Sequence, residues 1–292
     1  ITISNNNVSL SGSPVVTGIY KHGIQFSGTT YSTINGNTTH HNSSHGIYLS
    51  AGSANNTVSN NISYANANEF QRSANGISVS ASSNNTIIHN FTYANEDSGL
   101  QFYTSSSYNL VLGNVTYGNA DHGIDFNASP NNTVVGNTVH GNVTVGINFE
   151  GASLPGSGGA TVINNIMFEN GVLLLAGGGT ASGSEGNLRF DTRSYTGNTL
   201  DYNLYYLVSG AVQIIDWNGV KYATLAGFQA AQPGMELHGL EADPLFVAPA
   251  PIAVRPSNTI GGLPAINAGN YYITAGSPAI DSANSDAPYQ PL

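Results

Sequence analysis

Three aspartates and one histidine occupy matched points of a repeating sequence, and their spacing would bring them together. Asp97 and Asp121 are 24 residues apart, His122 follows at once, and Asp125 comes three residues later. If the repeat stacks one turn of chain on the next, the carboxylates of Asp97 and Asp121 lie about 5 Å apart. Two carboxylates that close are unfavourable unless a proton or a cation intervenes.

Clustered oxygen ligands of irregular geometry suit Ca²⁺. We therefore predict a calcium site at Asp97, Asp121 and Asp125, with His122 as its neighbour or as a base that faces the substrate. A transition metal held by His122 and the carboxylates is a second reading of the same residues. Acidic side chains that solvate a turn are a third.

The elements that must position these residues repeat about every 23 positions. One marker, with glycines at 23, 46, 76, 99, 123 and 146, reads HGIQF, HGIYL, NGISV, SGLQF, HGIDF and VGINF. A fixed period of this length, with short alternating apolar runs and Asn/Gly turns, predicts a solenoid with one coil per repeat. In each marker strand the apolar residues should point inward, and the residue between them, such as Asp125, should point outward.

Three short strands per repeat predict an all-β, three-sheet parallel β-helix. Two asparagine columns, which include Asn114 and Asn119, should hydrogen-bond from coil to coil at the corners, where asparagine also tolerates left-handed turns. The repeat decays after about residue 185, so we expect β-helix coils over 1–185, then irregular coils and a C-terminal cap over 186–292. The run YATLAGFQAAQ (222–232) indicates a short helix.

Composition excludes several classes of function. The net charge is −10, from 6 Lys+Arg and 16 Asp+Glu, so a phosphate backbone finds no basic face and nucleic acid is excluded as a partner. No apolar run approaches the length needed to span a membrane. The chain has no cysteine and therefore no disulfide.

The repeat resembles the right-handed parallel β-helix of the pectate-lyase-like superfamily over most of residues 1–185. The carboxylate pattern resembles the calcium site of family 9 polysaccharide lyases, in which an Asp on one coil joins an Asp-Asp-x-x-Asp run on the next. Asp97 matches the first position, Asp121 and Asp125 match the ends of the run, and His122 replaces its second Asp. The resemblance implies a right-handed fold and a secreted or cell-surface protein that acts on an acidic polysaccharide.

That family removes the sugar C5 proton with a lysine, whereas this chain has none between Lys21 and Lys221. The reaction needs a cation on the uronate carboxylate and a positioned base. The candidates for catalysis are His122, His45, Tyr48 and Arg72. Histidine has the most suitable intrinsic pKa for a base, while Arg72 is better suited to clamp a substrate carboxylate.

The sequence therefore favours a Ca²⁺-dependent polysaccharide lyase acting on a uronate-containing glycan. The missing lysine and the few cations leave open a non-catalytic surface protein, such as a glycan-binding module, an adhesin or an assembly subunit. A glycoside hydrolase on the same scaffold also stays open, because the aspartates could supply its two carboxylates.

Overall fold

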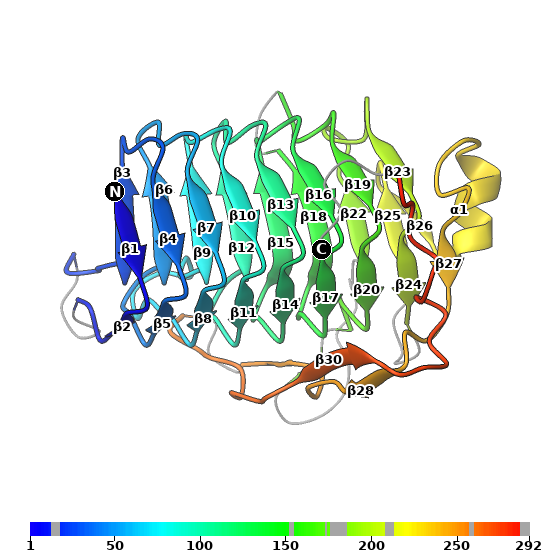
Figure 1. The fold of residues 1–292 in the computed structure, drawn as a ribbon. Coiled ribbons are helices and arrows are strands. Elements are labelled where there is room, and N and C mark those ends of the chain that lie inside the picture. The colour runs from blue at the N-terminus through cyan, green and yellow to red at the C-terminus, as the bar shows by residue number, and fades with distance from the viewer. Residues whose placement is uncertain are drawn as a thin grey trace.

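The structure is a computed structural model that describes residues 1–12, 18–151, 155–172, 174–175, 186–207, 213–256 and 260–286. Its coils stack into a rod with three long sheets (Figure 1). Each coil contributes one strand to each sheet, and parallel pairing joins every strand to those of the coils before and after it. The predicted all-β parallel β-helix is confirmed.

The first and second sheets hold mostly three-residue strands. The first contains β1 (Thr2–Ser4), β4 (Thr33–Asn35), β7 (Thr57–Ser59), β10 (Thr86–Ile88), β13 (Leu110–Leu112), β16 (Thr133–Val135), β19 (Thr161–Ile163) and β23 (Thr199–Asp201). The second contains β2 (Asn7–Ser9), β5 (Thr38–His40), β8 (Ile62–Tyr64), β11 (Phe91–Tyr93), β14 (Val115–Tyr117), β17 (Thr138–His140), β20 (Ile166–Phe168), β24 (Leu204–Tyr206) and β27 (Leu240–Glu241).

The third sheet carries the glycine-marked strands and ends in an antiparallel hairpin. Its members are β3 (Ile24–Ser27), β6 (Ile47–Ser50), β9 (Ile77–Ser80), β12 (Leu100–Tyr103), β15 (His122–Asn127), β18 (Val145–Glu150), β22 (Leu188–Phe190), β25 (Ile215–Trp217) and β26 (Val220–Tyr222). In-register pairing sets Gln101 beside Asp125, and Asp125 beside Asn148.

Inward columns of the third sheet build the core. Phe102, Phe126, Phe149 and Phe190 form one continuous ring stack with centroids 4.7, 4.6 and 4.2 Å apart. The predicted inward residues are therefore confirmed. The expectation that the alternate column is exposed is wrong for part of its length. Asp125 is 3% exposed and Asn148 is fully buried, because polar side chains of neighbouring coils cover one another.

Buried asparagine ladders run along the rod. In each ladder the side-chain Nδ2 of one asparagine donates to the Oδ1 of the next coil, and the same Oδ1 accepts from the preceding backbone N–H. The two predicted ladders are confirmed, and a third begins at Asn56. The first runs through Asn37, Asn61, Asn90, Asn114, Asn137, Asn165 and Asn203 to Glu236. The second runs through Asn42, Asn66, Asn95, Asn119, Asn142, Asn170 and Asn187.

We expected the ladder asparagine to adopt the left-handed backbone conformation at the corner. The residue that precedes it adopts this conformation instead. Gly113 precedes Asn114 with φ of 60°, and His89 precedes Asn90 with φ of 54°. The marker glycines serve close approach instead. A Cβ at Gly99 would lie 2.7 Å from the ladder amide of Asn119 and 2.8 Å from the carbonyl oxygen of Gly123. These columns of glycine and asparagine must therefore pack together.

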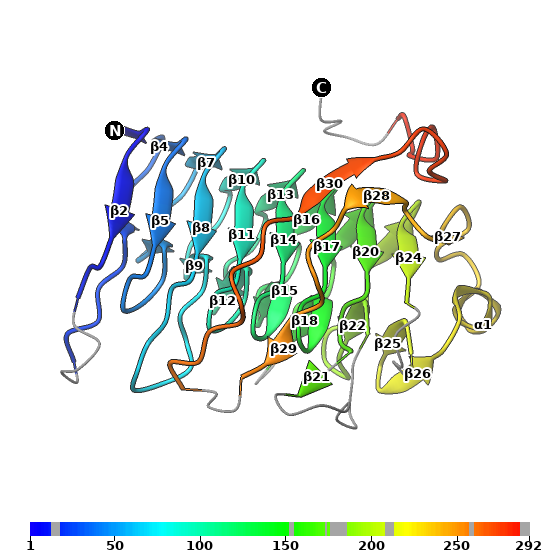
Figure 2. The ribbon, with the colours of Figure 1, turned by 90° about the horizontal axis from the view of Figure 1, so that it is seen from below.

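Beyond residue 185 the first sheet continues to Asp201, the third to Tyr222 and the second to Glu241. The predicted helix is found as α1 (Leu225–Ala231) at the end of the stack (Figure 1). The chain then runs back across several coils (Figure 2). Two small sheets form on this return path: β21 (Leu174–Leu175) with β29 (Val254–Arg255), and β28 (Phe246–Ala248) with β30 (Asn270–Ile273). The division of the chain at 185 stays a prediction. No helix in the described ranges is long and apolar enough to cross a membrane.

The ladder predicts a large cost for a single truncation. Asn137 donates through Nδ2 to Val111, Val135 and Asn165, and its Oδ1 accepts two bonds from Asn114. Asn137→Ala should lower the free energy of unfolding by about 3–5 kcal/mol, because buried partners are left unsatisfied. Urea unfolding measures this. Replacing the exposed Gln25 by Ala should change the free energy of unfolding by less than about 0.5 kcal/mol. Similar values for both variants would contradict the claim that the ladder stabilises the fold.

Candidate functional site

An enlarged coil carries Arg72 to the edge of the third sheet. The coil between β8 and β9 contains the loop 67–74, which the fully buried Glu96 contacts. The Glu96 carboxylate accepts from the backbone N–H of Asn68 at 2.8 Å and of Gly261 at 2.6 Å. Burial raises the pKa of Glu96, while these bonds oppose the rise. Glu96 thus joins the loop, the rod and the returning C-terminal segment.

Arg72 lies against the two aspartates that the repeat places on adjacent coils. The backbone N–H of Asp121 donates to the carbonyl oxygen of Asp97 at 3.2 Å, so the two are neighbours as predicted. Arg72 Nη2 lies 3.5 Å from Asp97 Oδ1 and also forms an ion pair with Asp121 Oδ2. The side chains are 28%, 13% and 18% exposed for Arg72, Asp97 and Asp121. A guanidinium therefore supplies the positive charge between these carboxylates.

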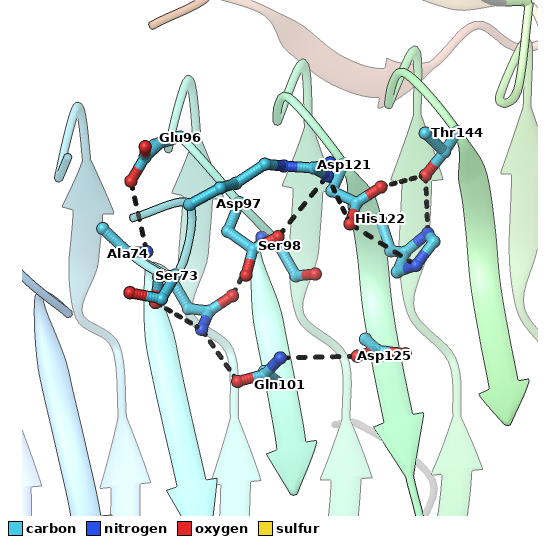
Figure 3. A network of polar contacts seen from close by, with 12 residues as sticks. Ser73, Ala74, Glu96, Asp97, Ser98, Gln101, Asp121, His122, Asp125 and Thr144 are labelled. Carbon is cyan, nitrogen blue, oxygen red and sulfur yellow. Dashed lines mark hydrogen bonds and ion pairs between the residues drawn. The ribbon is translucent and has the colours of Figure 1, made fainter. Parts of the chain in front are cut away.

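Asp121 also contacts the next two polar groups along the edge. Thr144 Oγ1 donates to Asp121 Oδ1 at 2.5 Å and lies 2.7 Å from His122 Nδ1. His122 Nε2 is 3.6 Å from Asp121 Oδ2. The chain Arg72, Asp121, Thr144 and His122 is thus continuous, as the dashed contacts around Asp121 in Figure 3 show for its last three members.

The charges of this group are set by burial and by one another. Burial lowers the pKa of His122, but Asp121 and Asp125 outweigh it and the pKa is raised. Burial raises the pKa of Asp121, yet His122 and Arg72 bring it down to about 2. The pKa of Asp97 is raised well above its usual value by burial and by Asp121. An ionised Asp121 therefore lies between Arg72 and His122, and the neighbouring Asp97 holds its proton more tightly than an ordinary aspartate does.

Asp125 lies further along the strands, with Gln101 (Figure 3). Its Oδ1 accepts from Asn148 at 2.8 Å and its Oδ2 from Gln101 at 3.5 Å. Burial raises the pKa of Asp125 to about 7. Among the described residues, the group of three whose ligand atoms lie within 4.8 Å is His122, Asp125 and Glu150. The predicted trio of aspartates is therefore divided between Arg72 and this second group, in which Glu150 pairs with Arg189 at 2.9 Å.

A groove of about 610 Å³ opens beside Arg72 and Asp97. At its other end the rings of His22 and His45 stack with centroids 4.9 Å apart and planes 4° from parallel, and Tyr48 packs against both. Burial and Lys21 lower the pKa of His22 to about 4, and burial and His22 lower that of His45 to about 3. The groove thus has a charged end and an uncharged, ring-lined end.

The structure brings Arg72, Asp97, Asp121 and His122 together, and it places His45 and Tyr48 in the same groove at a distance of two coils. Reasoning from sequence did not assign Glu96, Thr144 or Asn148 to the site. Thr144 stands two positions before a marker glycine, in the same column as Asp97 and Asp121, so the repeat did hold its signal. The roles of all predicted site residues stay predictions.

Comparison with known proteins supports the architecture. The sequence model of the family described as "Right handed beta helix region" matches residues 66–194. No curated protein sequence matches. Pectate lyase Pel9A is similar in structure, with a TM-score of 0.58 and 17% identity, over 99% of this chain and 70% of that one.

Two A-modules of mannuronan C-5 epimerases of Azotobacter vinelandii are also similar. AlgE6 gives a TM-score of 0.57 at 16% identity, and AlgE4 gives 0.53 at 16%, each over 76% of this chain. The chain spans only 55% and 57% of the length of these two modules. At such identities the likeness shows the fold. The right-handed parallel β-helix that the resemblance implied is confirmed.

Proposed function

We propose that this protein is a polysaccharide lyase that acts on a uronate-containing glycan in the groove beside Arg72. The observation that carries the proposal is the cation and the protonatable carboxyl group at one point of that groove, Arg72 and Asp97. Proton abstraction next to a carboxylate needs both kinds of group. The names of the similar structures, a pectate lyase and C-5 epimerases of mannuronan, add support from proteins of the same fold.

The reaction is a β-elimination. A base takes the proton from C5 of the uronate, and that electron pair forms the double bond between C4 and C5. The bond from C4 to the glycosidic oxygen breaks, and the leaving oxygen takes a proton from an acid. Negative charge builds on the uronate carboxylate as the proton leaves, so a cation there stabilises the transition state more than the ground state.

Arg72 is the group that would hold the uronate carboxylate. Both of its ion pairs run through Nη2, so its other guanidinium donors can take the two carboxylate oxygens in a bidentate arrangement. Asp121 holds Arg72 and His122 in place. Its lowered pKa makes it a poor base and a good counter-ion.

Asp97 is the base that the geometry favours. It lines the groove, contacts Arg72 and has a raised pKa, and a carboxylate with a raised pKa is the stronger base once ionised. His122 is one of the four candidates that the sequence offers for the base, with His45, Tyr48 and Arg72. It has an 11% exposed side chain and a raised pKa, which suit a proton donor to the leaving oxygen better than a base. His45 and Tyr48 would contact sugar rings further along the groove.

Calcium dependence is the part of the sequence-based hypothesis that this arrangement supports least. The carboxylates of Asp97 and Asp121 already face the Arg72 guanidinium, and Asp125 is hydrogen-bonded to Asn148 and Gln101. These residues do not form an open cage of oxygen ligands, so the reaction that we propose does not use Ca²⁺. A polymeric substrate also implies a place of action outside the cytoplasm, and we propose that the protein is secreted or lies on the cell surface.

The β-elimination can be tested directly, because its product contains a double bond conjugated with a carboxylate. Incubation with pectate, alginate and other uronate polymers should produce the ultraviolet absorbance of an unsaturated uronate. Asp97 must be ionised to act as a base, and its pKa is raised. The pH at which kcat/KM rises should therefore lie well above the usual carboxyl pKa of about 4. Asp97→Asn should lower kcat by about 10²–10⁴-fold. It should not lower the free energy of unfolding at neutral pH, because the raised pKa means that the folded state disfavours the charge of Asp97, which Asn lacks.

The exposed Asp286→Asn serves as the control and should keep full activity. If the sugar is inverted at C5 with no double bond, the protein is an epimerase that shares the first step. If no polymer reacts while all are bound, the non-catalytic glycan-binding alternative holds. Cleavage of a neutral glycan would instead favour the hydrolase.

The role of the Arg72 guanidinium as the cation of the site can be tested with Ca²⁺. Adding Ca²⁺ or a chelator should not shift the melting temperature of the wild-type protein, because Arg72 occupies the position between the aspartates. Arg72→Met removes that charge and should lower stability by about 2 kcal/mol or more. Millimolar Ca²⁺ should then raise the melting temperature of Arg72→Met by several degrees. A calcium-induced rise of the same size in the wild-type protein would show that our assignment of the cation is wrong.

A further inference from the structure

We propose that the groove binds a glycan in which the uronate is flanked by uncharged sugars, with His22, His45 and Tyr48 forming the subsite for an uncharged ring. This inference rests on the proposed function for the identity of the charged subsite at Arg72. It goes beyond that function by assigning the neighbouring subsite and the charge pattern of the substrate.

The groove offers positive charge at one end only. Of the described residues that line it, Arg72 is the single lysine or arginine. That guanidinium is already shared with Asp97 and Asp121. Lys21 is exposed and is not among the lining residues, although it is near enough to help lower the pKa of His22. A homopolymer of uronates would place a carboxylate at every sugar, and all but one of these would lie against lining residues that carry no positive charge.

Hydrogen bonding shows that the histidine end is uncharged. The backbone N–H of Asn75 donates to His45 Nδ1 at 3.1 Å, so Nδ1 carries no proton and the ring is neutral with its hydrogen on Nε2. His22 lies parallel to that ring with centroids 4.9 Å apart, where two imidazolium cations would repel each other. The lowered pKa values of both histidines agree with this reading.

The same end has the polar and apolar groups that a neutral sugar needs. Tyr48 is tilted by 42° against both imidazole rings, with centroids 4.4 and 4.9 Å away, and aromatic faces pack against the C–H face of a pyranose. The hydroxyl groups of Ser44 and Ser78, which also line the groove, can exchange hydrogen bonds with sugar hydroxyls. Gln101, on the same coil as Asp97, also lines the groove, and its Oε1 accepts from Asn75 at 2.9 Å.

Coil spacing sets the length of the bound segment. His45 precedes β6, whereas Asp97 precedes β12 two strands away in the third sheet. Neighbouring strands are about 4.8 Å apart, so the two ends are separated by about 10 Å along the rod. A short oligosaccharide can therefore contact Arg72 with its uronate and the His22–His45–Tyr48 rings with a neighbouring sugar.

Calorimetric binding to the Asp97→Asn variant, which binds without turnover, tests this directly. The probes are oligogalacturonate and an oligosaccharide of equal length in which galacturonate alternates with rhamnose. The alternating oligomer should bind about tenfold or more tightly, and Tyr48→Ala should weaken its binding about tenfold. Tyr48→Phe keeps the aromatic ring and should bind the alternating oligomer as tightly as the variant with Tyr48 does. Tyr108→Ala, which removes a 63% exposed ring outside the groove, should have no effect.

His22→Lys adds a cation at the uncharged end. It should tighten oligogalacturonate binding about fivefold and make that binding more dependent on salt. Tighter binding of oligogalacturonate by the parent variant, or no binding of either probe, overturns the inference. If the alternating oligomer is preferred but wild-type protein turns over no polymer, the proposed function fails and this subsite assignment stands. If wild-type protein cleaves oligogalacturonate and binds it more tightly than the alternating oligomer, the proposed function stands and the subsite assignment fails.

Discussion

The register of the coils is the constraint on which the rest of this structure depends. A residue's neighbours in space are those about one repeat away in sequence, and buried amides keep that alignment. Each ladder asparagine satisfies the backbone of the next coil and its own side chain at the same time, so a slip of one residue would leave a row of buried polar groups unpaired. The apolar columns supply most of the burial energy, and a slip of one residue would also turn their side chains away from the core.

That register creates the electrostatic problem that the site solves. It forces Asp97 and Asp121 onto adjacent coils at a partly covered edge. The protein neutralises them with Arg72, which is held on a loop that Glu96 ties to the C-terminal segment. The result is one carboxyl group with a lowered pKa and one with a raised pKa beside a partly exposed guanidinium. Two carboxyl groups whose pKa values are pushed apart in this way have different chemical roles available to them.

Regular features of the repeat could be predicted from the sequence, and features that break the repeat could not. The inward columns, the asparagine ladders and the adjacency of Asp97 and Asp121 all follow from the period. Arg72 lies in an insertion, where the period gives no position, and its contact with the aspartates became visible only in the structure. The bond between Gly261 and Glu96 joins residues 165 positions apart and leaves no periodic signal. The burial of Asp125 depends on the side chains of neighbouring coils, which alternation within one strand cannot report.

A crystal structure of the Asp97→Asn variant, grown with a uronate oligosaccharide and millimolar Ca²⁺, tests the central claim most directly. That claim is that an internal arginine, and not a bound metal, meets the negative charge of the substrate. We expect the uronate carboxylate on the guanidinium of Arg72, with Asp121 still paired to it and no metal between the coils. A calcium ion bound by Asp121 and the sugar, with the Arg72 side chain turned away, would contradict the account.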